Sequence, residues 1–314
     1  MPASVRPGAH VVIGSGSVGR HIASHLAAAG ADVRVVTRSG IAIDDAVPLV
    51  CDASNPESLA RTIGEAAVVY NAANPSRYHR WHREWPPLAA CILAAAESVG
   101  AVLATVSNLY PYGRVEGRIH EGLPLEPVSL NGRVRRDMWR SALDAHEAGR
   151  VRVVEARGSD YVGRGVQSFV AGMTAALRDG KSPRGLGDPS LPHSWTYPGD
   201  LAATLIAAAN DDAALGRAWH AVTNEPRSQQ ELADDLADAA GVERQRVRPM
   251  SKAALWAARP LVPITRPVYS LLYQYEDPFV IDDSAARAAF GLEPTPWVEV
   301  VAETAADRRP LRIR

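Results

Sequence analysis

Val11-Val-Ile-Gly14-Ser-Gly16-Ser-Val-Gly19 decides the fold, because it places the pattern Gly-x-Gly-x-x-Gly between an apolar run and a helical stretch. The first glycine permits a tight turn, the second lets a phosphate approach the backbone, and the third allows close packing of helix on strand. A pyrophosphate would then lie on the helix N-terminus, where backbone N–H groups are free. An ordinary tight turn is the alternative. The motif predicts a dinucleotide-binding loop made of Gly14, Ser15, Gly16, Ser17, Val18 and Gly19.

Apolar stretches alternate with helical patterns through the first half of the chain. The expected strands cover 10–13, 32–37, 47–51, 67–71, 101–107 and 151–156, and the expected helices cover 20–29, 54–66, 87–99 and 131–148. This alternation is typical of a parallel sheet that is covered by helices on both faces. We therefore predict an α/β fold, a doubly wound parallel Rossmann sheet with a smaller mixed C-terminal substrate lobe.

The second half of the chain is less regular. It contains an expected helix over 200–209 with Asp200 as its N-cap, and one over 229–240 that is opened by the capping box Ser228-Gln-Gln-Glu231. Prolines divide 253–275 into short helical pieces, and 181–199 reads as loop. The predicted Rossmann domain covers 1–165, with 195–223 returning to it. The predicted substrate lobe covers 166–194 and 224–306, and 307–314 is expected to be a flexible tail.

The composition excludes several classes of function. The chain has 314 residues and a formal net charge of -1, which gives no electrostatic footprint for nucleic acid or an anionic membrane surface. Two cysteines, Cys51 and Cys91, cannot build a disulfide framework, so we expect a reducing compartment. No apolar run reaches the ~18 residues that span a bilayer, and the N-terminus lacks a signal-peptide core. We expect a cytoplasmic protein that acts on a small-molecule substrate.

The end of the second expected strand indicates which dinucleotide is bound. An acidic residue there would bind the 2′-hydroxyl of NAD, but the sequence has Thr37-Arg38-Ser39. A guanidinium suits a 2′-phosphate, so Arg38 favours NADP(H) over NAD(H). The alternative is a surface arginine that stacks on adenine and leaves the choice open. Asp52 is expected near the adenine, and Asn71, Ala72 and Ala73 let the cofactor ribose approach.

Further motifs follow the glycine loop in a fixed order. They are Cys51-Asp52, Asn71-Ala-Ala73, Ser107-Asn-Leu-Tyr-Pro-Tyr112-Gly113, Glu121 with Pro124 and Pro127, Arg157-Gly-Ser-Asp-Tyr161-Val-Gly163 and Trp195-Thr-Tyr197-Pro-Gly-Asp200. As an ordered set, they resemble the motifs of atypical or extended short-chain dehydrogenase/reductases of the NAD(P)-dependent epimerase/dehydratase family. The resemblance covers nearly the whole chain. It implies a Rossmann-fold enzyme that uses a nicotinamide cofactor.

The chain departs from this family at the catalytic positions. Members commonly use a Tyr-x-x-x-Lys pair with a preceding Ser or Thr, but Lys181 and Lys252 are the only lysines, and neither has a tyrosine four residues upstream. The resemblance places Asn131 at the tyrosine, Arg135 at the lysine and Asn108 at the Ser/Thr. Arg135 is expected to bind the ribose or a substrate carboxylate, because its own pKa is too high for proton exchange. The two asparagines can hydrogen-bond a carbonyl but supply no proton.

Tyrosines are the remaining candidates for an acid. Tyr110 is expected at the carboxyl end of the fifth strand and is the first choice, with a packing or substrate-wall role as the alternative. Tyr78, Tyr161 and Tyr197 are secondary candidates. The aromatic and basic segment 74–86 borders the expected nicotinamide pocket, so substrate contacts are predicted for Tyr78, Trp81, Tyr161 and Trp195. The alternative is that this segment starts a helix and packs its aromatics inward.

Three functions are compatible with these residues. The first is an NADP(H)-dependent oxidoreductase that acts on a small carbonyl or hydroxyl compound. The second is an isomerase, dehydratase or cyclase that retains its cofactor without net redox. The third is a non-catalytic dinucleotide sensor. No metal site is expected, because the paired histidines lack acidic or cysteine partners. The resemblance also implies a homodimer through helices beside the sheet, for which 87–99 is apolar enough, although this surface would equally suit the core.

Overall fold

The central element is a seven-stranded sheet whose strands all run parallel. The computed structural model describes residues 5–166 and 168–308. The strand order is β11-β7-β5-β4-β1-β2-β3, with β1 Ala9–Ile13, β2 Asp32–Thr37, β3 Val47–Val50, β4 Ala66–Asn71, β5 Val102–Asn108, β7 Arg152–Gly158 and β11 Ala218–His220. The order reverses between β1 and β4, so a crevice opens at their carboxyl ends, where doubly wound folds bind ligands. The predicted fold class is confirmed.

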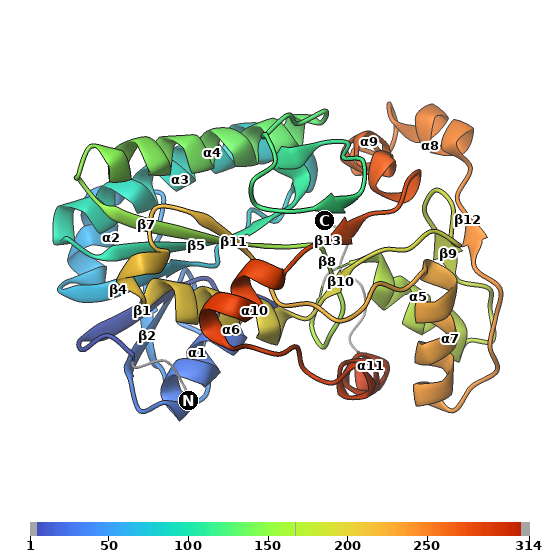
Figure 1. Ribbon diagram of the computed structural model, residues 1–314, viewed down its shortest axis with the longest axis horizontal. Helices are drawn as coiled ribbons and strands as arrows, with labels where there is room; N and C mark the ends of the chain where they lie inside the picture. Colours follow the sequence, from blue (N-terminus) through green and yellow to red (C-terminus); the bar gives the residue numbers. More distant parts are fainter. Residues whose placement is uncertain (1–4, 167, 309–314) are drawn as a thin grey trace.

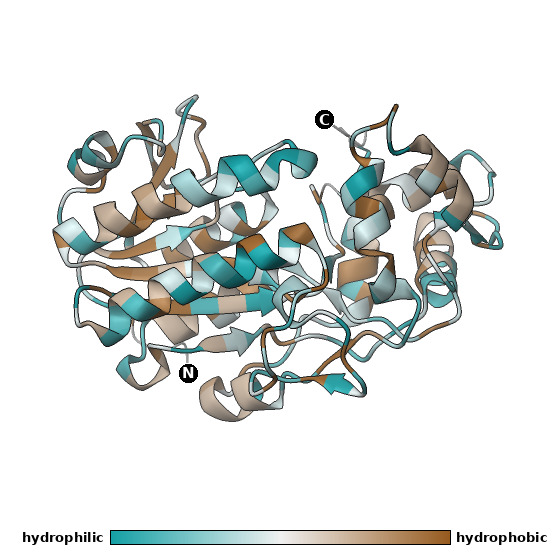
Figure 2. Ribbon diagram, turned by 90° about the horizontal axis from the view of Figure 1, so that it is seen from above, coloured by the Kyte–Doolittle hydropathy of each residue, from teal (hydrophilic) through white to brown (hydrophobic). Residues whose placement is uncertain are grey.

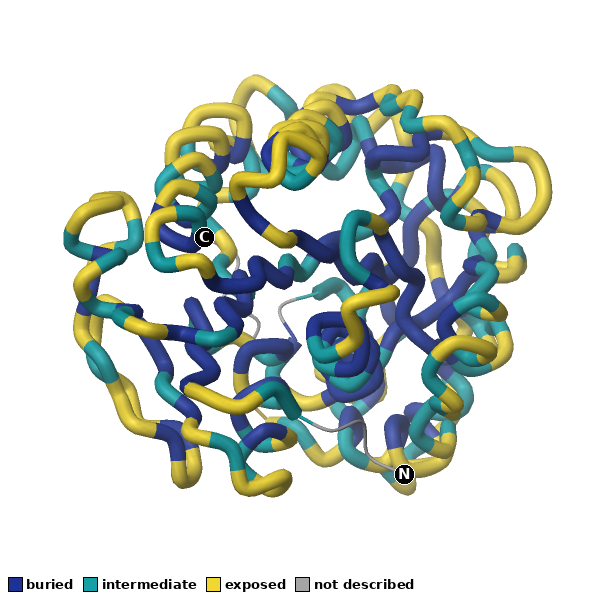
Figure 3. Tube along the Cα trace, turned by 60° about the vertical axis from the view of Figure 1, so that its left-hand side comes forward, coloured by how far each residue is buried: buried dark blue, intermediate teal, exposed yellow. Residues whose placement is uncertain are grey.

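Helices cover both faces of this sheet (Figure 1). One face carries α1 Ser17–Ala28, α6 Pro198–Ala209 and α10 Ser284–Phe290; the other carries α2 Pro56–Ile63, α3 Trp81–Val99 and α4 Leu130–Glu147. Each layer encloses its own apolar core, with strand residues alternating between the two. Figure 2 shows apolar residues concentrated on the strands, and Figure 3 shows that these strands are buried beneath exposed helix surfaces and loops.

The C-terminal lobe is built from short elements. Its helices are α5 Phe169–Arg178, α7 Gln229–Ala240, α8 Lys252–Ala258, α9 Thr265–Ser270 and α11 Trp297–Ala306. Strand pairs β8 Asp160–Tyr161 with β10 Trp195–Thr196, β9 Arg184–Gly185 with β12 Arg248–Pro249, and β6 Arg118–Ile119 with β13 Val280–Ile281 connect distant parts of the chain. The part of the chain that the structure describes also contains the short 3-10 helices η1 Tyr78–Arg80, η2 Tyr110–Tyr112, η3 Asp212–Ala214 and η4 Leu272–Tyr275. The capping box of Ser228 and Glu231 is present, as predicted.

Helices α3 and α6 both begin before the residues predicted from the sequence. Helix α3 begins at Trp81, six residues earlier than expected, and contains Pro86 and Pro87. Burial of Trp81 and Trp85 offsets the backbone hydrogen bonds that the two prolines cannot make. Helix α6 begins at Pro198 after Tyr197, so the prediction of Asp200 as N-cap is wrong. Pro198 occupies the first helical position, where its missing N–H costs little.

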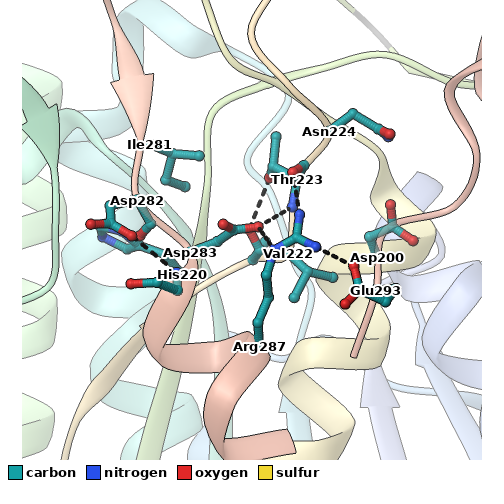
Figure 4. A network of polar contacts seen from close by, with 12 residues as sticks. Asp200, His220, Val222, Thr223, Asn224, Ile281, Asp282, Asp283, Arg287 and Glu293 are labelled. Atoms are coloured by element: carbon teal, nitrogen blue, oxygen red, sulfur yellow. Dashed lines mark hydrogen bonds and ion pairs between the residues drawn. The ribbon is translucent and has the colours of Figure 1, made fainter. Parts of the chain in front are cut away.

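The C-terminal segment is tied to the sheet by a polar network (Figure 4). The Asp283 carboxylate accepts hydrogen bonds from the Thr223 backbone N–H and from the Arg287 side chain, and Arg287 also donates to the Thr223 carbonyl. This network holds α10 against α6 and β11, although the predicted boundaries assign α10 to the lobe. Of the expected flexible tail, Asp307 accepts a hydrogen bond from the Gly165 N–H, and 309–314 lie outside the described residues.

Candidate functional site

The glycine loop after β1 has the geometry that a phosphate-binding turn needs. Gly14 has φ 105°, a backbone conformation that favours glycine, and its N–H donates to the Val36 carbonyl. A Cβ on Gly19 would lie 2.2 Å from the Gly14 carbonyl oxygen, so only glycine fits where α1 meets the loop. A Cβ on Gly16 would meet no atom within 4 Å. The loop is therefore tightly packed behind Gly16 and open in front of it.

A cavity of about 1030 Å³ lies in front of this loop. Of the residues predicted to bind cofactor, it is lined by Gly14, Ser15, Gly16, Arg38, Asp52, Ala72 and Ala73. Val18 and Gly19 are buried inside α1, and Asn71 is buried with its side-chain oxygen accepting the Ala73 N–H. The cavity therefore lies at the carboxyl ends of β1, β2, β3 and β4. Two of its charged side chains, Arg38 and Asp52, follow β2 and β3.

The charged groups of the cavity include Arg38 and Asp52, which follow neighbouring strands. Hydrogen bonds from Ser54 hold the pKa of the Asp52 carboxyl below its usual range, with a smaller contribution from the nearby Arg38 charge. Asp52 is thus an acceptor already engaged by Ser54. Arg38 places a permanent positive charge in the cavity. The residues present fit an adenine dinucleotide: an open loop for its diphosphate, a cation for an anionic group and acceptors for its adenosine.

Two phenols, Tyr78 and Tyr110, are joined by a hydrogen bond of 2.6 Å between their hydroxyls. Both side chains pack against the cluster of Trp81, Trp85 and Val134, which Ala73 of the cavity wall also contacts. Burial raises the pKa of both phenols well above the ordinary value, while Asn131 and the Arg135 charge oppose the rise for Tyr78. The Tyr110 N–H donates to Asn108 Oδ1 at 3.2 Å. Both tyrosines are therefore neutral at pH 7.

Asn131 and Arg135 lie one turn apart at the start of α4, where Ser129 caps the helix. The Arg135 guanidinium stacks on Trp81 and Trp85, at 5.0 and 4.5 Å from the ring centres, and donates to the Val106 carbonyl. Burial lowers the pKa of Arg135, but an arginine stays charged at pH 7. Trp81 is buried and begins α3, as in the alternative reading of segment 74–86.

Several buried polar atoms near the start of α4 and the end of β5 have unused hydrogen-bonding capacity. Within the described part of the chain, Ser107 Oγ, Asn131 Nδ2 and Arg135 Nε have no hydrogen-bond partner. Buried polar groups are normally paired, because leaving one unpaired costs about 1–3 kcal/mol. Their gathering beside the phenol pair fits a polar ligand at this place, such as a ribose or a substrate carbonyl.

Sequence reasoning missed a second polar cluster, centred on Asp160 in β8. Asp160 Oδ2 accepts hydrogen bonds from His193 Nε2 at 2.9 Å and from the Tyr275 hydroxyl at 2.5 Å. The His193 ring stacks on Tyr275 with centroids 4.9 Å apart. Only Asp160 belongs to a motif in the sequence; its partners are 33 and 115 residues away. No spacing of residues in the sequence predicts that the side chains of Asp160, His193 and Tyr275 contact one another.

The other predicted substrate residues are separated by the structure. Burial raises the pKa of Tyr161 to about 12, and the Arg135 charge opposes this rise, so Tyr161 belongs with the group at the start of α4. Trp195 is buried in the core of the lobe, where its N–H donates to the Arg227 carbonyl. Tyr197 donates to Glu303. The structure thus brings Tyr78, Tyr110, Tyr161, Asn131 and Arg135 together and places Trp195 elsewhere.

Residues of the shared family motifs form a buried hydrogen-bond chain behind the site. Arg157 pairs with Glu155 and donates to the Tyr112 hydroxyl at 2.7 Å. Burial lowers the pKa of His220 to about 4, so the imidazole is neutral and its Nε2 accepts from Tyr112. The Glu121 carboxylate accepts a hydrogen bond from the His220 backbone N–H, which ties the acidic loop to β11.

The structure was also compared with the predictions about metal ions, membrane spans and the homodimer. In residues 5–166 and 168–308, no group of three or more His, Cys, Asp or Glu side chains is arranged to hold a metal ion. Over the same ranges, every helix is too short or too polar to cross a lipid bilayer. A cavity of about 440 Å³ lies between α4 and α3, which contains residues 87–99 of the predicted dimer contact. The homodimer remains a prediction.

The parallel sheet, the glycine loop and the cavity at the strand reversal define the class of dinucleotide-binding α/β enzymes. The sequence profile of the NAD dependent epimerase/dehydratase family matches residues 11–220, and the chain belongs to this family. It is an epimerase/dehydratase-like enzyme, and this confirms the family resemblance of the motifs. A search of curated protein sequences found no match.

Solved structures share the fold over nearly the whole chain. UDP-glucose 4-epimerase from Thermus thermophilus, solved with NAD, has a TM-score of 0.75 and 19% identity, covering 95% of this chain and 97% of that one. The Thermotoga maritima UDP-glucose 4-epimerase, solved with UDP-glucose, has a TM-score of 0.76 and 17% identity with the same coverage. A dTDP-glucose 4,6-dehydratase mutant from Streptomyces venezuelae has a TM-score of 0.75 and 19% identity, covering 94% and 95%.

Proposed function

We propose that this chain is an NADP(H)-dependent oxidoreductase that acts on a small carbonyl or hydroxyl compound. The observation that carries the proposal is the half-buried Tyr78–Tyr110 pair, which packs against the same cluster, Trp81, Trp85 and Val134, as Ala73 of the glycine-loop cavity. It offers a proton donor where the expected tyrosine is replaced by Asn131. A bound nicotinamide would donate or accept a hydride at the substrate carbon.

The cavity supports a phosphorylated dinucleotide. Gly14, Ser15 and Gly16 would hold the diphosphate through the backbone, because the first turn of α1 contains no acidic residue and its N-cap residue makes no side-chain cap. Arg38 would pair with the 2′-phosphate of NADP, which NAD lacks. The solved neighbours contain NAD, but at 19% identity or less they share the fold without fixing the choice of cofactor.

The phenol pair would relay a proton to the substrate. The two hydroxyl oxygens lie 2.6 Å apart and either phenol can donate, so Tyr110 would be free to donate to a substrate oxygen when Tyr78 donates to Tyr110. When a carbonyl is reduced, Tyr110 would give this proton to the new alkoxide and would recover one from Tyr78. Arg135 would stabilise negative charge that reaches Tyr78, since its charge opposes the raised pKa of that phenol. Arg135 would therefore stabilise this negative charge through its own positive charge and would not exchange a proton.

A second candidate is an isomerase, dehydratase or cyclase that retains its cofactor without net redox. The family profile and the two UDP-glucose 4-epimerase structures favour it. The same phenols would serve, because an intermediate oxidation followed by reduction first removes and then returns a proton at the same substrate oxygen.

One experiment separates the two candidates. The purified protein is loaded with NADPH and challenged with a panel of aldehydes and ketones, while the absorbance band of the reduced nicotinamide is followed. Loss of the band with catalytic turnover supports the oxidoreductase. Product formation from a hydroxyl or carbonyl compound with NADP⁺ bound and no net change in the band supports the second candidate. Failure to bind either NADP(H) or NAD(H) would overturn both.

A further inference from the structure

The lobe carries a strongly basic segment that the net charge of the whole chain does not reveal. The chain has a net charge of -1, yet residues 244–275 contain six basic residues and no acidic one. They include β12, α8 and α9, which Figure 1 shows on the right-hand side of the molecule. Positive charge is therefore concentrated at one end of a protein whose overall charge is balanced.

Two neighbouring strands of the lobe place arginines side by side. Arg184 of β9 lies opposite Arg248 of β12 in a parallel pair, and both residues are exposed. Partners in such a pair point to the same face, so the two like charges repel each other at short range. Arg246 is also exposed. Among the described residues these three arginines form no ion pair, whereas Arg244 and Lys252 are paired with carboxylates. An anion that contacts both strands would relieve the repulsion.

The end of α8 and the turn that follows it expose large apolar side chains. Leu261 is 84% exposed, Trp256 57% and Val262 44%. Single exposed apolar residues are common on proteins, but a group of them within 256–262 marks a contact surface. The Arg259 guanidinium lies 5.2 Å from the centre of the Trp256 ring, so a positive charge borders this apolar turn.

The basic strands and the apolar turn belong to one packed unit. Leu186, next to β9, and Leu255 of α8 belong to one apolar cluster, against which Met250, next to β12, and Tyr269 of α9 also pack. The Met250 N–H donates to the Gly185 carbonyl at 2.9 Å, which ties the two strands together. We call six exposed side chains of this unit the basic–apolar patch: Arg184, Arg246, Arg248, Trp256, Leu261 and Val262.

The chemistry of the basic–apolar patch selects its partner. A nucleic acid would satisfy the arginines but leave Leu261 and Trp256 in water, and a purely apolar partner would leave the arginines unpaired. An anionic bilayer offers phosphates at its surface and hydrocarbon beneath them, and the boundary between these layers favours Trp side chains. Of these three partners, only the bilayer complements both halves of the patch.

We infer that the basic–apolar patch binds the surface of an anionic lipid bilayer, with the arginines on lipid phosphates and Leu261 and Val262 inserted between the lipids. The positive charges attract the anionic surface, and insertion removes the apolar side chains from water. The strength of binding scales with both contributions. The residues of the patch do not line the dinucleotide cavity, so the inference does not depend on the reaction.

Sedimentation with lipid vesicles tests this binding. The whole protein is mixed with vesicles of phosphatidylcholine alone, or of equal parts phosphatidylcholine and phosphatidylglycerol, and the bound fraction is measured after centrifugation. We expect the protein to bind the anionic vesicles at least about tenfold more tightly than the neutral ones, and to bind them less as salt is raised. Brominated acyl chains should quench Trp256 fluorescence, and this quenching should be lost in Trp256→Phe.

Substitutions separate the charge of the patch from its apolar side chains. Arg184→Gln combined with Arg248→Gln should weaken binding to anionic vesicles about 30-fold, because each arginine near such a surface contributes about fivefold. Leu261→Asn should weaken it at least about tenfold, because the inserted apolar side chain is lost. Arg61→Gln on α2 and Val298→Asn on α11 are the matched controls and should bind as the wild type does. Both residues are exposed, on helices that Figure 1 shows away from the patch.

Equal binding to neutral and anionic vesicles, or binding to neither, would overturn the inference, and so would wild-type binding of Leu261→Asn. An RNA oligonucleotide that binds more tightly than the anionic vesicles would overturn it in favour of a nucleic acid. Light scattering that shows a dimer in the wild type and a monomer in Leu261→Asn would overturn it in favour of a second copy of this chain. The cofactor is titrated separately, so failure of this inference is distinguished from failure of the proposed function.

Discussion

Replacing Arg38 by alanine tests the cofactor assignment, because it changes one charge on the wall of the cavity. Arg38 follows β2 and lines the same cavity as Gly14 and Gly16. Two unit charges 4 Å apart interact by about 1 kcal/mol in water and about 4 kcal/mol near a protein surface. A half-open cavity lies between these limits, so the loss of the guanidinium should cost about 2–3 kcal/mol of NADP⁺ binding. This corresponds to a weakening of about 30- to 160-fold.

NAD⁺ has no 2′-phosphate, so its affinity should change by less than about threefold in the same variant. Both dissociation constants are measured by calorimetry at one fixed salt concentration, because an exposed charge pair is screened by salt. Arg61→Ala, an exposed arginine of α2, is the control. Equal weakening of both cofactors, or no weakening of either, would refute the assignment of Arg38 to the phosphate.

Three further predictions concern the loop and the core. Gly19→Ala should lower the free energy of unfolding by about 2 kcal/mol or more, since its Cβ would lie 2.2 Å from the Gly14 carbonyl oxygen; urea unfolding measures this. Gly16→Ala should leave unfolding nearly unchanged but weaken cofactor binding, because its Cβ meets no protein atom; equal destabilisation of the two variants would contradict the role of the loop. Burial raises the pKa of Asp200 from 3.8 to about 6, so the folded protein holds a proton that the unfolded chain releases, and stability from this group falls by up to about 3 kcal/mol as pH rises through 4 to 6. Asp200→Asn should therefore gain stability relative to wild type across this range in thermal unfolding, and parallel pH profiles would refute the raised pKa.

The cofactor loop was predictable from the sequence because all of its determinants are local. A strand, a glycine-spaced turn and a helix follow one another within 20 residues, and the open position at Gly16 follows from this order. Arg38 and Asp52 both line the cavity because each follows the end of a neighbouring strand. Parallel strands bring their carboxyl ends to one edge of the sheet, so sequence order is enough to group such residues.

Other features depend on contacts that sequence order does not contain. The double proline at 86–87 is typical of a first helical turn, yet burial of Trp81 and Trp85 starts α3 earlier. Asp200 looked like a cap, but it binds the N–H and hydroxyl of Thr295, which is 95 residues away. Asp160 and Tyr275 meet because the lobe folds back across the sheet.

The sequence predicted the two members of the phenol pair but not the hydrogen bond between them. Tyr110 was predicted as the acid from its place after a strand, and Tyr78 was a secondary candidate 32 residues earlier. Their hydrogen bond depends on the tertiary structure, because the two side chains come from η1 and η2 and meet where both pack against the cluster of Trp81, Trp85 and Val134. Local sequence features identified Tyr78 and Tyr110 as candidates, and the tertiary structure shows that their hydroxyls are hydrogen-bonded.

The most direct test of the account is the rate of substrate-dependent NADPH oxidation in Tyr110→Phe, compared with Tyr70→Phe. Tyr70 is a buried phenol that contacts His10 and Asn210 in the core, so its loss leaves the site intact. Removing a general acid lowers the rate by about 10²- to 10⁴-fold. We predict a loss of this size in Tyr110→Phe with an unchanged NADPH dissociation constant, and near wild-type turnover in Tyr70→Phe. Full activity of Tyr110→Phe would contradict it.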